Sequence, residues 1–208
     1  MKLKQVVVAA AMAAVGASAS AAVVLDEGFE SVASLGWLQT NSGAPGAGWF
    51  QGESAVSFPA AAGSDDSFLA ANFVDTATSI SDWIFTPVLT LEKKSTIAFK
   101  VRALGSIGFL DTVEVYFSGS GASTALGDFS LIGSYSSATD EGWVDKSYDL
   151  FTGYTTGRFA FRYVVADTAT AGDYLGIDSL TISTVPAPAS LALVGLALAG
   201  VAATRRRA

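Results

Sequence analysis

Apolar and polar side chains alternate along three segments of this 208-residue chain. Residues 97–103 place an apolar residue at every second position, with Lys100 and Arg102 between them. Residues 112–117 and 159–165 repeat the pattern. A period of two is typical of strands that bury one face and expose the other. We therefore predict a β-strand in each segment.

Shorter apolar runs, separated by glycine, serine, aspartate or asparagine, predict further strands at residues 83–85, 88–91, 129–135, 144–150 and 175–182. No segment keeps a 3.6-residue apolar period over three turns, so no long amphipathic helix is expected. Residues 40–67 are rich in glycine, alanine and serine, and we expect a long loop with short strands there. Antiparallel strands with one solvated face pack as two sheets, so the predicted class is an all-β, two-sheet antiparallel sandwich.

The alternation slips inside the last predicted strand. Leu175 and Ile177 share one face, whereas Leu180 and Ile182 fall on the other. A change of phase within a strand is typical of a β-bulge, which inserts an extra residue. We therefore expect a bulge at Asp178.

Both ends of the chain carry apolar segments that lie outside the sandwich. Residues 1–5 are basic, residues 6–16 are apolar, and residues 17–21 offer two small-x-small cleavage sites. Residues 1–21 are therefore predicted to be a signal-peptide helix that signal peptidase removes during export. The sandwich is then expected at residues 22–183, followed by a sorting or anchor segment at 184–208.

The C-terminal segment combines a proline-containing break, an apolar helix and a basic cluster. The residues that define it are Val185, Pro186, Ala187, Pro188, Arg205, Arg206 and Arg207. The uncharged segment 189–203 between these two groups would form roughly 22 Å of helix, short of the roughly 30 Å hydrocarbon core. Such a short helix is expected to hold the protein in the membrane only temporarily. The arginines would remain on the cytoplasmic side, so the bulk of the chain is expected on the opposite side of the inner membrane.

In this order the three parts resemble a PEP-CTERM sorting signal, which occurs on exported proteins of Gram-negative bacteria that make extracellular polysaccharide. The resemblance implies that an exosortase, a membrane protease-transpeptidase, recognises and cleaves the tail. The protein would then be transiently anchored before it reaches the cell surface or the extracellular space. Ala187 stands where the motif usually has glutamate. The alternative is a plain C-terminal anchor that is never cut.

The charge of the chain limits its partners. The sequence has 12 basic and 19 acidic residues, and five of the basic ones lie in the two targeting ends. The exported domain therefore keeps 7 basic residues against 19 acidic ones, a net charge of −12. This charge disfavours nucleic acid and anionic lipid as partners, and favours cations or neutral sugars.

The chain contains neither cysteine nor histidine. Their absence excludes disulfide bonds and zinc sites built on these residues. It also excludes Ser-His-Asp and Cys-His catalytic machinery. Any chemistry must come from carboxylates, hydroxyls and aromatic rings.

A second set of short motifs runs through the predicted sandwich, at residues 27–31, 36–37, 83–89, 142–143, 154–163 and 175–180. In this order they resemble the choice-of-anchor or cleaved-adhesin jelly-roll domains, relatives of the MAM and concanavalin-like sandwiches. The resemblance implies a jelly-roll sandwich that acts as an extracellular adhesive or sugar-binding module.

The same resemblance implies a calcium site, because some related domains hold calcium near the Phe-Glu segment and the final strand. Here it nominates Glu30 and Asp178. Calcium takes six to eight oxygen ligands, so backbone carbonyls would have to supply most of them. The alternative is that Asp178 caps a turn and Glu30 is solvated. The four tryptophans could stack on sugar rings if they were exposed, and the alternative is that they pack in the core or at an edge: Trp37, Trp49, Trp83 and Trp143. Trp49, in the glycine-rich segment 43–52, is the best candidate for exposure.

The expected function is that of a noncatalytic cell-surface or extracellular-matrix protein that binds polysaccharide or contributes to biofilm adhesion. The alternative is a carboxylate-dependent glycan hydrolase or lyase on the same scaffold. Such an enzyme needs two carboxylates facing one sugar, about 5–9 Å apart. Asp65 and Asp66 are neighbours whose side chains would point apart in a strand, and no spacing identifies another pair. The sequence therefore nominates no catalytic residue.

Overall fold

Strands dominate the part of the chain that the computed structural model describes, which is residues 20–41, 48–74, 78–92, 94–106, 108–151, 153 and 155–185. The strands are β1 (Ala22–Glu27), β2 (Leu38–Asn41), β3 (Phe50–Gln51), β4 (Leu69–Asn72), β5 (Ile80–Phe85), β6 (Leu89–Leu91), β7 (Lys94–Ala103), β8 (Asp111–Ser118), β9 (Ser130–Ser137), β10 (Val144–Phe151), β11 (Thr155–Val165) and β12 (Tyr174–Val185). Two 3-10 helices, η1 (Val32–Ser34) and η2 (Leu126–Asp128), lie between them. The helices predicted for the signal peptide and for residues 189–203 lie outside the described residues.

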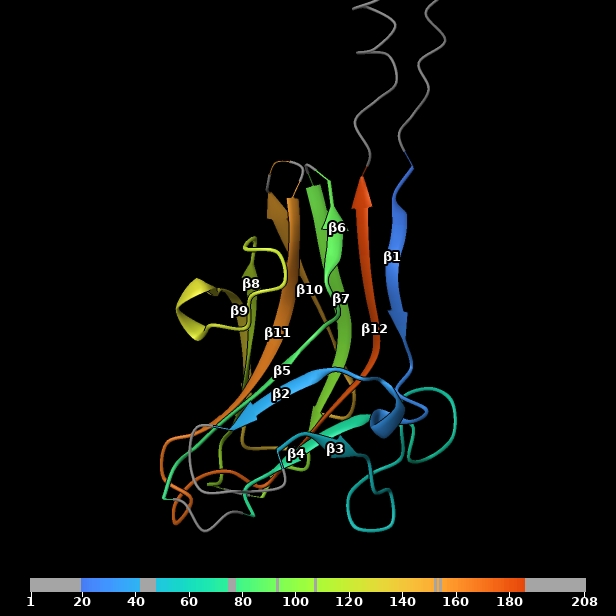
Figure 1. The fold of residues 1–208 in the computed structure, drawn as a ribbon. Coiled ribbons are helices and arrows are strands. Elements are labelled where there is room, and N and C mark those ends of the chain that lie inside the picture. The colour runs from blue at the N-terminus through green and yellow to red at the C-terminus, as the bar shows by residue number, and fades with distance from the viewer. Residues whose placement is uncertain are drawn as a thin grey trace, which may run out of the picture. The chain divides into compact units, whose positions relative to one another are not determined.

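The strands form two antiparallel sheets (Figure 1). The first sheet has the order β10-β7-β12-β4-β3, and β1 also pairs with β12. The second has the order β2-β5-β11-β8-β9, and β6 also pairs with β11. The predicted all-β, two-sheet antiparallel sandwich is confirmed, and each strand predicted from the sequence is present.

The core follows from the alternation that predicted the strands. Along β7, every second residue from Ser95 to Ala103 is buried, while Lys100 and Arg102 face outward. The buried face of β11 opposes it from the second sheet, where the rings of Phe99 and Phe161 meet edge-on at 5.1 Å. Each fully buried side chain of this size contributes about 1.5–3 kcal/mol relative to an exposed one. The sandwich is therefore held by apolar burial.

The predicted bulge in the last strand is confirmed. The pairing of β12 with β7 shifts register between Asp178 and Thr181. Ser179 takes a φ of 52°, a left-handed conformation that is uncommon for a residue with a side chain. The extra length lets Ile177 and Leu180 both reach the core, where each is fully buried.

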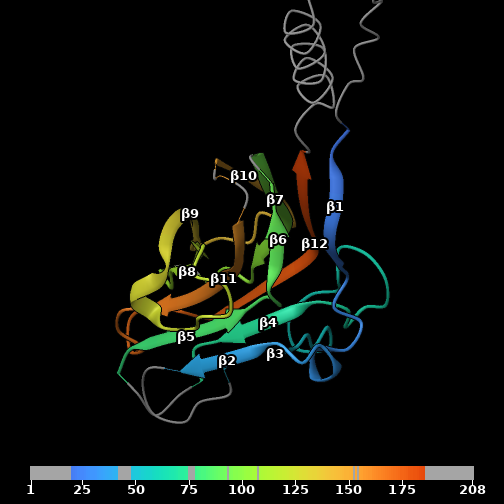
Figure 2. The ribbon, with the colours of Figure 1, turned by 45° about the horizontal axis from the view of Figure 1, so that its top comes forward.

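The first and last residues of the sandwich lie at the same end. Ala22 pairs with Thr184, so the start of β1 and the end of β12 run side by side (Figure 1). Strands β3 and β4 lie at the opposite end, around the start of β12 (Figure 2). At about 3.3 Å per residue, Tyr174 is roughly 36 Å along β12 from Val185, the last residue of the strand.

Candidate functional site

A loop of residues 52–68 packs on the outer face of the first sheet. It brings Phe58 and Phe68 together as a stacked pair with ring centroids 5.3 Å apart. Phe58 also meets Trp143 edge-on at 5.3 Å and Tyr174 edge-on at 5.7 Å. Phe58, Phe68 and Tyr174 are all buried. This group, here called the outer aromatic cluster (Phe58, Phe68, Trp143 and Tyr174), is a small second core outside the sandwich.

Gly176 on β12 makes room for these rings. A Cβ atom at this position would lie 2.9 Å from atoms of Phe58, Phe68 and Trp143. Real Cβ atoms essentially never approach other atoms so closely. Glycine at a strand position often marks such a close approach.

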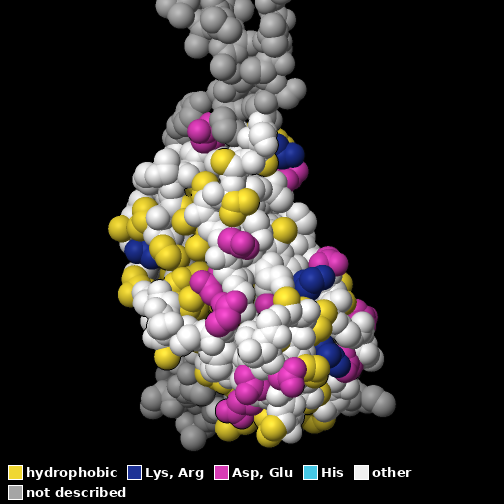
Figure 3. Space-filling view, turned by 90° about the vertical axis from the view of Figure 1, so that its right-hand side faces the viewer, with side chains coloured by type: hydrophobic (Ala, Val, Ile, Leu, Met, Phe, Trp, Pro, Cys, Tyr) yellow, Lys and Arg dark blue, Asp and Glu magenta, His cyan; other side chains and the backbone are white. Residues whose placement is uncertain are grey.

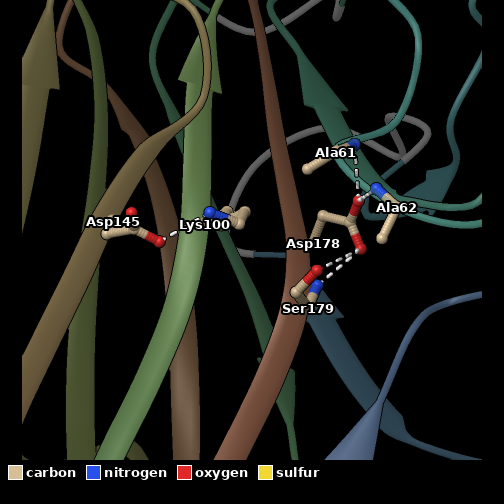
Figure 4. A network of polar contacts seen from close by, with 6 residues as sticks. All are labelled: Ala61, Ala62, Lys100, Asp145, Asp178 and Ser179. Atoms are coloured by element: carbon tan, nitrogen blue, oxygen red, sulfur yellow. Dashed lines mark hydrogen bonds and ion pairs between the residues drawn. The ribbon is translucent and has the colours of Figure 1, made fainter.

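Asp178 ties the same loop to β12 (Figure 4). Its Oδ2 accepts the backbone N–H groups of Ala61 at 2.7 Å and Ala62 at 3.0 Å. Its Oδ1 accepts the N–H and the hydroxyl of Ser179. The residue is fully buried. Asp178 therefore anchors the loop to the sheet. The alternative expectation, that Asp178 caps a turn, accounts for its contact with Ser179 but not for its contacts with the loop.

The loop and the ends of β3, β4 and β12 border an open pocket of about 380 Å³, here called the aromatic pocket. Its lining residues are Phe50, Glu53, Val56, Asn72 and Tyr174. The rings of Phe50 and Tyr174 meet edge-on at 5.9 Å, and the Tyr174 hydroxyl accepts the backbone N–H of Glu53 at 3.1 Å. The pocket thus combines two aromatic rings with a carboxylate and a carboxamide at its edge.

A second pocket, of about 440 Å³, lies beside the bulge and includes Glu30. Its lining residues are Asp26, Glu27, Gly28, Glu30, Ser179 and Thr181. Asp26 accepts a hydrogen bond from the Thr181 hydroxyl at 3.1 Å, and Glu27 accepts one from the Phe29 N–H at 2.8 Å. Glu30 is exposed, as the solvated alternative expects.

The predicted calcium pair does not fit this geometry. Asp178 is absent from the lining of the pocket that Glu30 borders. Both Asp178 oxygens already accept backbone N–H donors. In the described part of the chain, no three acidic side chains are grouped so that they could hold a metal ion. The assignment of Asp178 as a calcium ligand together with Glu30 is therefore corrected.

The prediction that Trp49 is exposed is wrong. Its ring is only 2% exposed and lies 6.4 Å from Phe161 and from Tyr163. Its Nε1 donates to the carbonyl of Asp82 at 2.9 Å, which satisfies its one polar group. Gln39 holds the Trp49 backbone with two hydrogen bonds of 3.0 Å, so the ring points into the sandwich. A buried ring cannot stack on a sugar.

The outer face of the second sheet carries a polar network. Arg162 donates to Ser81 at 2.7 Å and to Glu114 at 3.1 Å, and the Tyr116 hydroxyl donates to Glu114 at 2.8 Å. The Arg162 guanidinium also lies 5.5 Å from the centre of the Trp83 ring. The charged groups of this face are thus engaged with one another, which makes it a weaker candidate for ligand binding than the aromatic pocket.

A buried acid lies at the start of β8. Oδ1 of Asp111 accepts hydrogen bonds from the Tyr163 hydroxyl and from the Asp173 N–H at 2.9 Å, whereas its Oδ2 has no partner among the described residues. Burial raises the pKa of Asp111 above its ordinary value, and the hydrogen bonds only partly oppose this. Burial also raises the pKa of Tyr163. Ionised Asp111 is therefore poorly solvated in the folded protein.

We expect Asp111→Asn to gain stability relative to the wild type as the pH rises. The folded-state pKa is raised, so the contribution of this group to stability is present below the unfolded-state value of about 3.9 and is lost as the pH rises through the folded-state pKa. Asparagine does not titrate, so the variant avoids this loss. Urea unfolding from pH 3 upward would show a growing difference in the free energy of unfolding. A constant difference across that range would contradict the expectation.

Comparisons with solved structures define the class of the sandwich. The K3 cleaved adhesin domain of Lys-gingipain from Porphyromonas gingivalis aligns with a TM-score of 0.60 at 19% identity, covering 79% of this chain and 99% of that domain. The K1 domain aligns with a TM-score of 0.57 at 17% identity, covering 78% and 99%. The K2 domain aligns with a TM-score of 0.56 at 20% identity, covering 76% and 96%. The chain therefore contains a jelly-roll domain of the cleaved-adhesin fold.

The C-terminal segment is identified separately. Residues 184–207 match the PEP-CTERM protein-sorting motif. The chain thus carries a motif that indicates export and sorting to the cell surface and that implies processing by an exosortase. No curated protein sequence matches the chain. Within the described residues, no helix has the length and apolar character needed to cross a membrane.

None of the residues that line the aromatic pocket was nominated from the sequence. Phe50 comes from β3, Glu53 and Val56 from the loop, Asn72 from β4 and Tyr174 from β12. No local motif links these positions. The available signal was the aromatic content of residues 50–68, which exceeds what a solvated loop needs.

Proposed function

We propose that this protein is a noncatalytic surface or extracellular-matrix protein that binds polysaccharide through the aromatic pocket and contributes to biofilm adhesion. The observation that carries the proposal is the combination, in one pocket, of the partly exposed Phe50 ring, backed by the buried Tyr174, with Glu53 and Asn72. Aromatic rings offer apolar faces that pack on the C–H groups of a sugar. Carboxylate and carboxamide groups hydrogen-bond its hydroxyls. Pockets with apolar walls and a few polar groups are typical ligand sites.

The position of the pocket supports a role in adhesion. It lies at the start of β12, whereas the sorting motif matches from residue 184, at the end of the same strand. A strand of 12 residues separates the two. The names of the three similar Lys-gingipain structures also describe adhesin domains.

A catalytic role finds less support in the pocket. Hydrolysis of a glycosidic bond needs two carboxyl groups on opposite sides of one sugar. A single carboxylate, that of Glu53, lines the aromatic pocket. The alternative function of a glycan hydrolase or lyase predicts that a bound oligosaccharide is shortened, and chromatography of the recovered ligand distinguishes the two.

The route to the surface follows from the two ends of the chain. Signal peptidase removes residues 1–21, the apolar segment 189–203 holds the protein in the inner membrane, and an exosortase cleaves near Pro188. We expect mass spectrometry of the protein from its native host to show loss of the residues after Pro188. An intact terminus at Arg205–Arg207 would contradict cleavage and would favour a permanent anchor.

The test of the pocket is Phe50→Ala. Loss of a central stacking ring is expected to weaken polysaccharide binding about tenfold or more, since about 1.4 kcal/mol corresponds to a factor of ten. Affinity electrophoresis of the full chain, solubilised in a detergent without sugar headgroups, measures the change. The control is Phe151→Ala, because Phe151 is 75% exposed on β10 and does not line the pocket. Equal binding by the two variants would contradict the proposed site.

A further inference from the structure

The aromatic pocket has an acidic wall. Glu53 lines it, and no lysine or arginine is among its lining residues. Burial raises the pKa of Tyr174, and its hydroxyl accepts the backbone N–H of Glu53 at 3.1 Å. Asp66 lies beside the next residue, because its Oδ1 accepts the backbone N–H of Ser54 at 2.7 Å. Hydrogen bonds from Ser54 hold the pKa of Asp66 below its ordinary value, so this carboxylate is charged wherever proteins are normally studied. A bound ligand therefore meets negative charge beside an aromatic floor.

Most basic side chains of the described residues are paired with acids that do not line this pocket. Within the described residues, four basic side chains form ion pairs: Lys94 with Asp149, Lys100 with Asp145, Arg102 with Asp140 and Arg162 with Glu114. The exported domain retains its net charge of −12. Acidic side chains accordingly outnumber basic ones on the face seen in Figure 3. A field of this sign attracts cationic polymers and repels uronate-rich ones.

Acidic residues alone would not define a ligand, but the pocket adds aromatic surface to the charge. The Phe50 ring, which the buried Tyr174 meets edge-on at 5.9 Å, is partly exposed and lines the pocket. A sugar ring provides C–H groups for such a wall, and an amino substituent provides a cation for the neighbouring carboxylates. Neither a simple metal cation nor a neutral glucan uses both features of the pocket.

We propose that the aromatic pocket selects polysaccharides whose amino sugars carry free, protonated amines, and that Glu53 recognises the amine. This inference rests on the proposed function, because it names the class of polysaccharide bound at the same site. The sugar ring packs on the partly exposed Phe50 ring, which the buried Tyr174 supports from behind, and the ammonium group lies toward Glu53. N-acetylated sugars of the same linkage retain the ring packing and lose the ion pair.

The test compares two oligosaccharides of equal length and linkage, a β-1,4-linked glucosamine oligomer and its fully N-acetylated counterpart. The full chain, in a detergent without sugar headgroups, is titrated with each oligomer below neutral pH, where the amines are protonated. We expect the glucosamine oligomer to bind about three- to tenfold more tightly, in keeping with a partly exposed ion pair. The preference is expected to shrink at high salt.

Two matched variants assign the preference to a residue. Glu53→Gln is expected to abolish the preference for free amines while binding of the acetylated oligomer is retained. Glu30→Gln, which removes an exposed carboxylate of the other pocket, is expected to keep the preference. Equal affinity of the wild type for both oligomers, or loss of the preference in Glu30→Gln instead, would overturn the inference and leave the proposed function intact. Binding of neither oligomer overturns the inference, and the proposed function itself falls only if no other polysaccharide binds.

Discussion

Truncation of Phe68 to alanine is expected to lower the free energy of unfolding by about 3–5 kcal/mol, the range for a large buried aromatic side chain. Phe68 is fully buried, with Phe58 stacked at 5.3 Å and Trp143 edge-on at 5.7 Å. The loop cannot easily refill the space, because Asp178 and β12 fix its position. Urea unfolding measures the loss.

Phe151→Ala is the matched control for this prediction. The substitution is chemically identical, but Phe151 is 75% exposed and its main ring contact is the Lys94 ammonium at 5.7 Å. We expect its free energy of unfolding to change by less than about 1 kcal/mol. If Phe68→Ala is no more destabilising than the control, the outer aromatic cluster is not a core.

Asp178→Ala is expected to lower the free energy of unfolding by about 2–4 kcal/mol. The variant leaves the buried N–H groups of Ala61 and Ala62 without their acceptor, and each lost partner costs about 1–3 kcal/mol. Because the loop also carries Glu53 and Val56, polysaccharide binding should weaken along with stability. Chemical unfolding and a binding titration on the same sample measure both effects.

Asp145→Ala provides the control on the same sheet. Asp145 pairs with Lys100 at 2.7 Å, and Lys100 lies opposite Asp178 in the strand register, but the Asp145 side chain is 83% exposed. Exposed pairs of this kind contribute little, so the expected change is within about 1 kcal/mol. Figure 4 shows the two carboxylates on neighbouring parts of the sheet with different partners. Equal losses in the two variants would contradict the anchoring role of Asp178.

The sandwich was predictable because its long strands bury one face and expose the other. β7, β8 and β11 show that alternation directly. The bulge in β12 was predictable for the same reason, since Ile177 and Leu180 must both reach the core. In these strands the alternation of apolar and polar residues shows directly which face is buried in the fold.

β4 was missed because both of its faces are covered. Leu69 and Ala71 face the sandwich core, whereas Ala70 lies under the outer aromatic cluster, so the strand shows no alternation. β2 was missed for the opposite reason, because three of its four residues are exposed and few are apolar. A sequence pattern reports a strand only where its two faces meet different surroundings.

The candidate site depended on contacts between distant segments. Trp49 was expected to be exposed because its neighbours are rich in glycine, yet Gln39, ten residues earlier, holds its backbone so that the ring is buried. Asp178 was expected to bind a cation, yet its Oδ2 accepts backbone N–H groups that lie more than a hundred residues away in sequence. The aromatic pocket joins residues 50–56 with Asn72 and Tyr174. Pairings of this kind are set by the fold and leave no local signature.

The most direct test of the central claim is a glycan array probed with the full chain in a detergent without sugar headgroups, with and without calcium. We expect binding to polysaccharide in both conditions, strongest for polymers with free amines, and loss of the signal in Phe50→Ala while Phe151→Ala retains it. The absence of any bound glycan, or full binding by Phe50→Ala, would contradict the account.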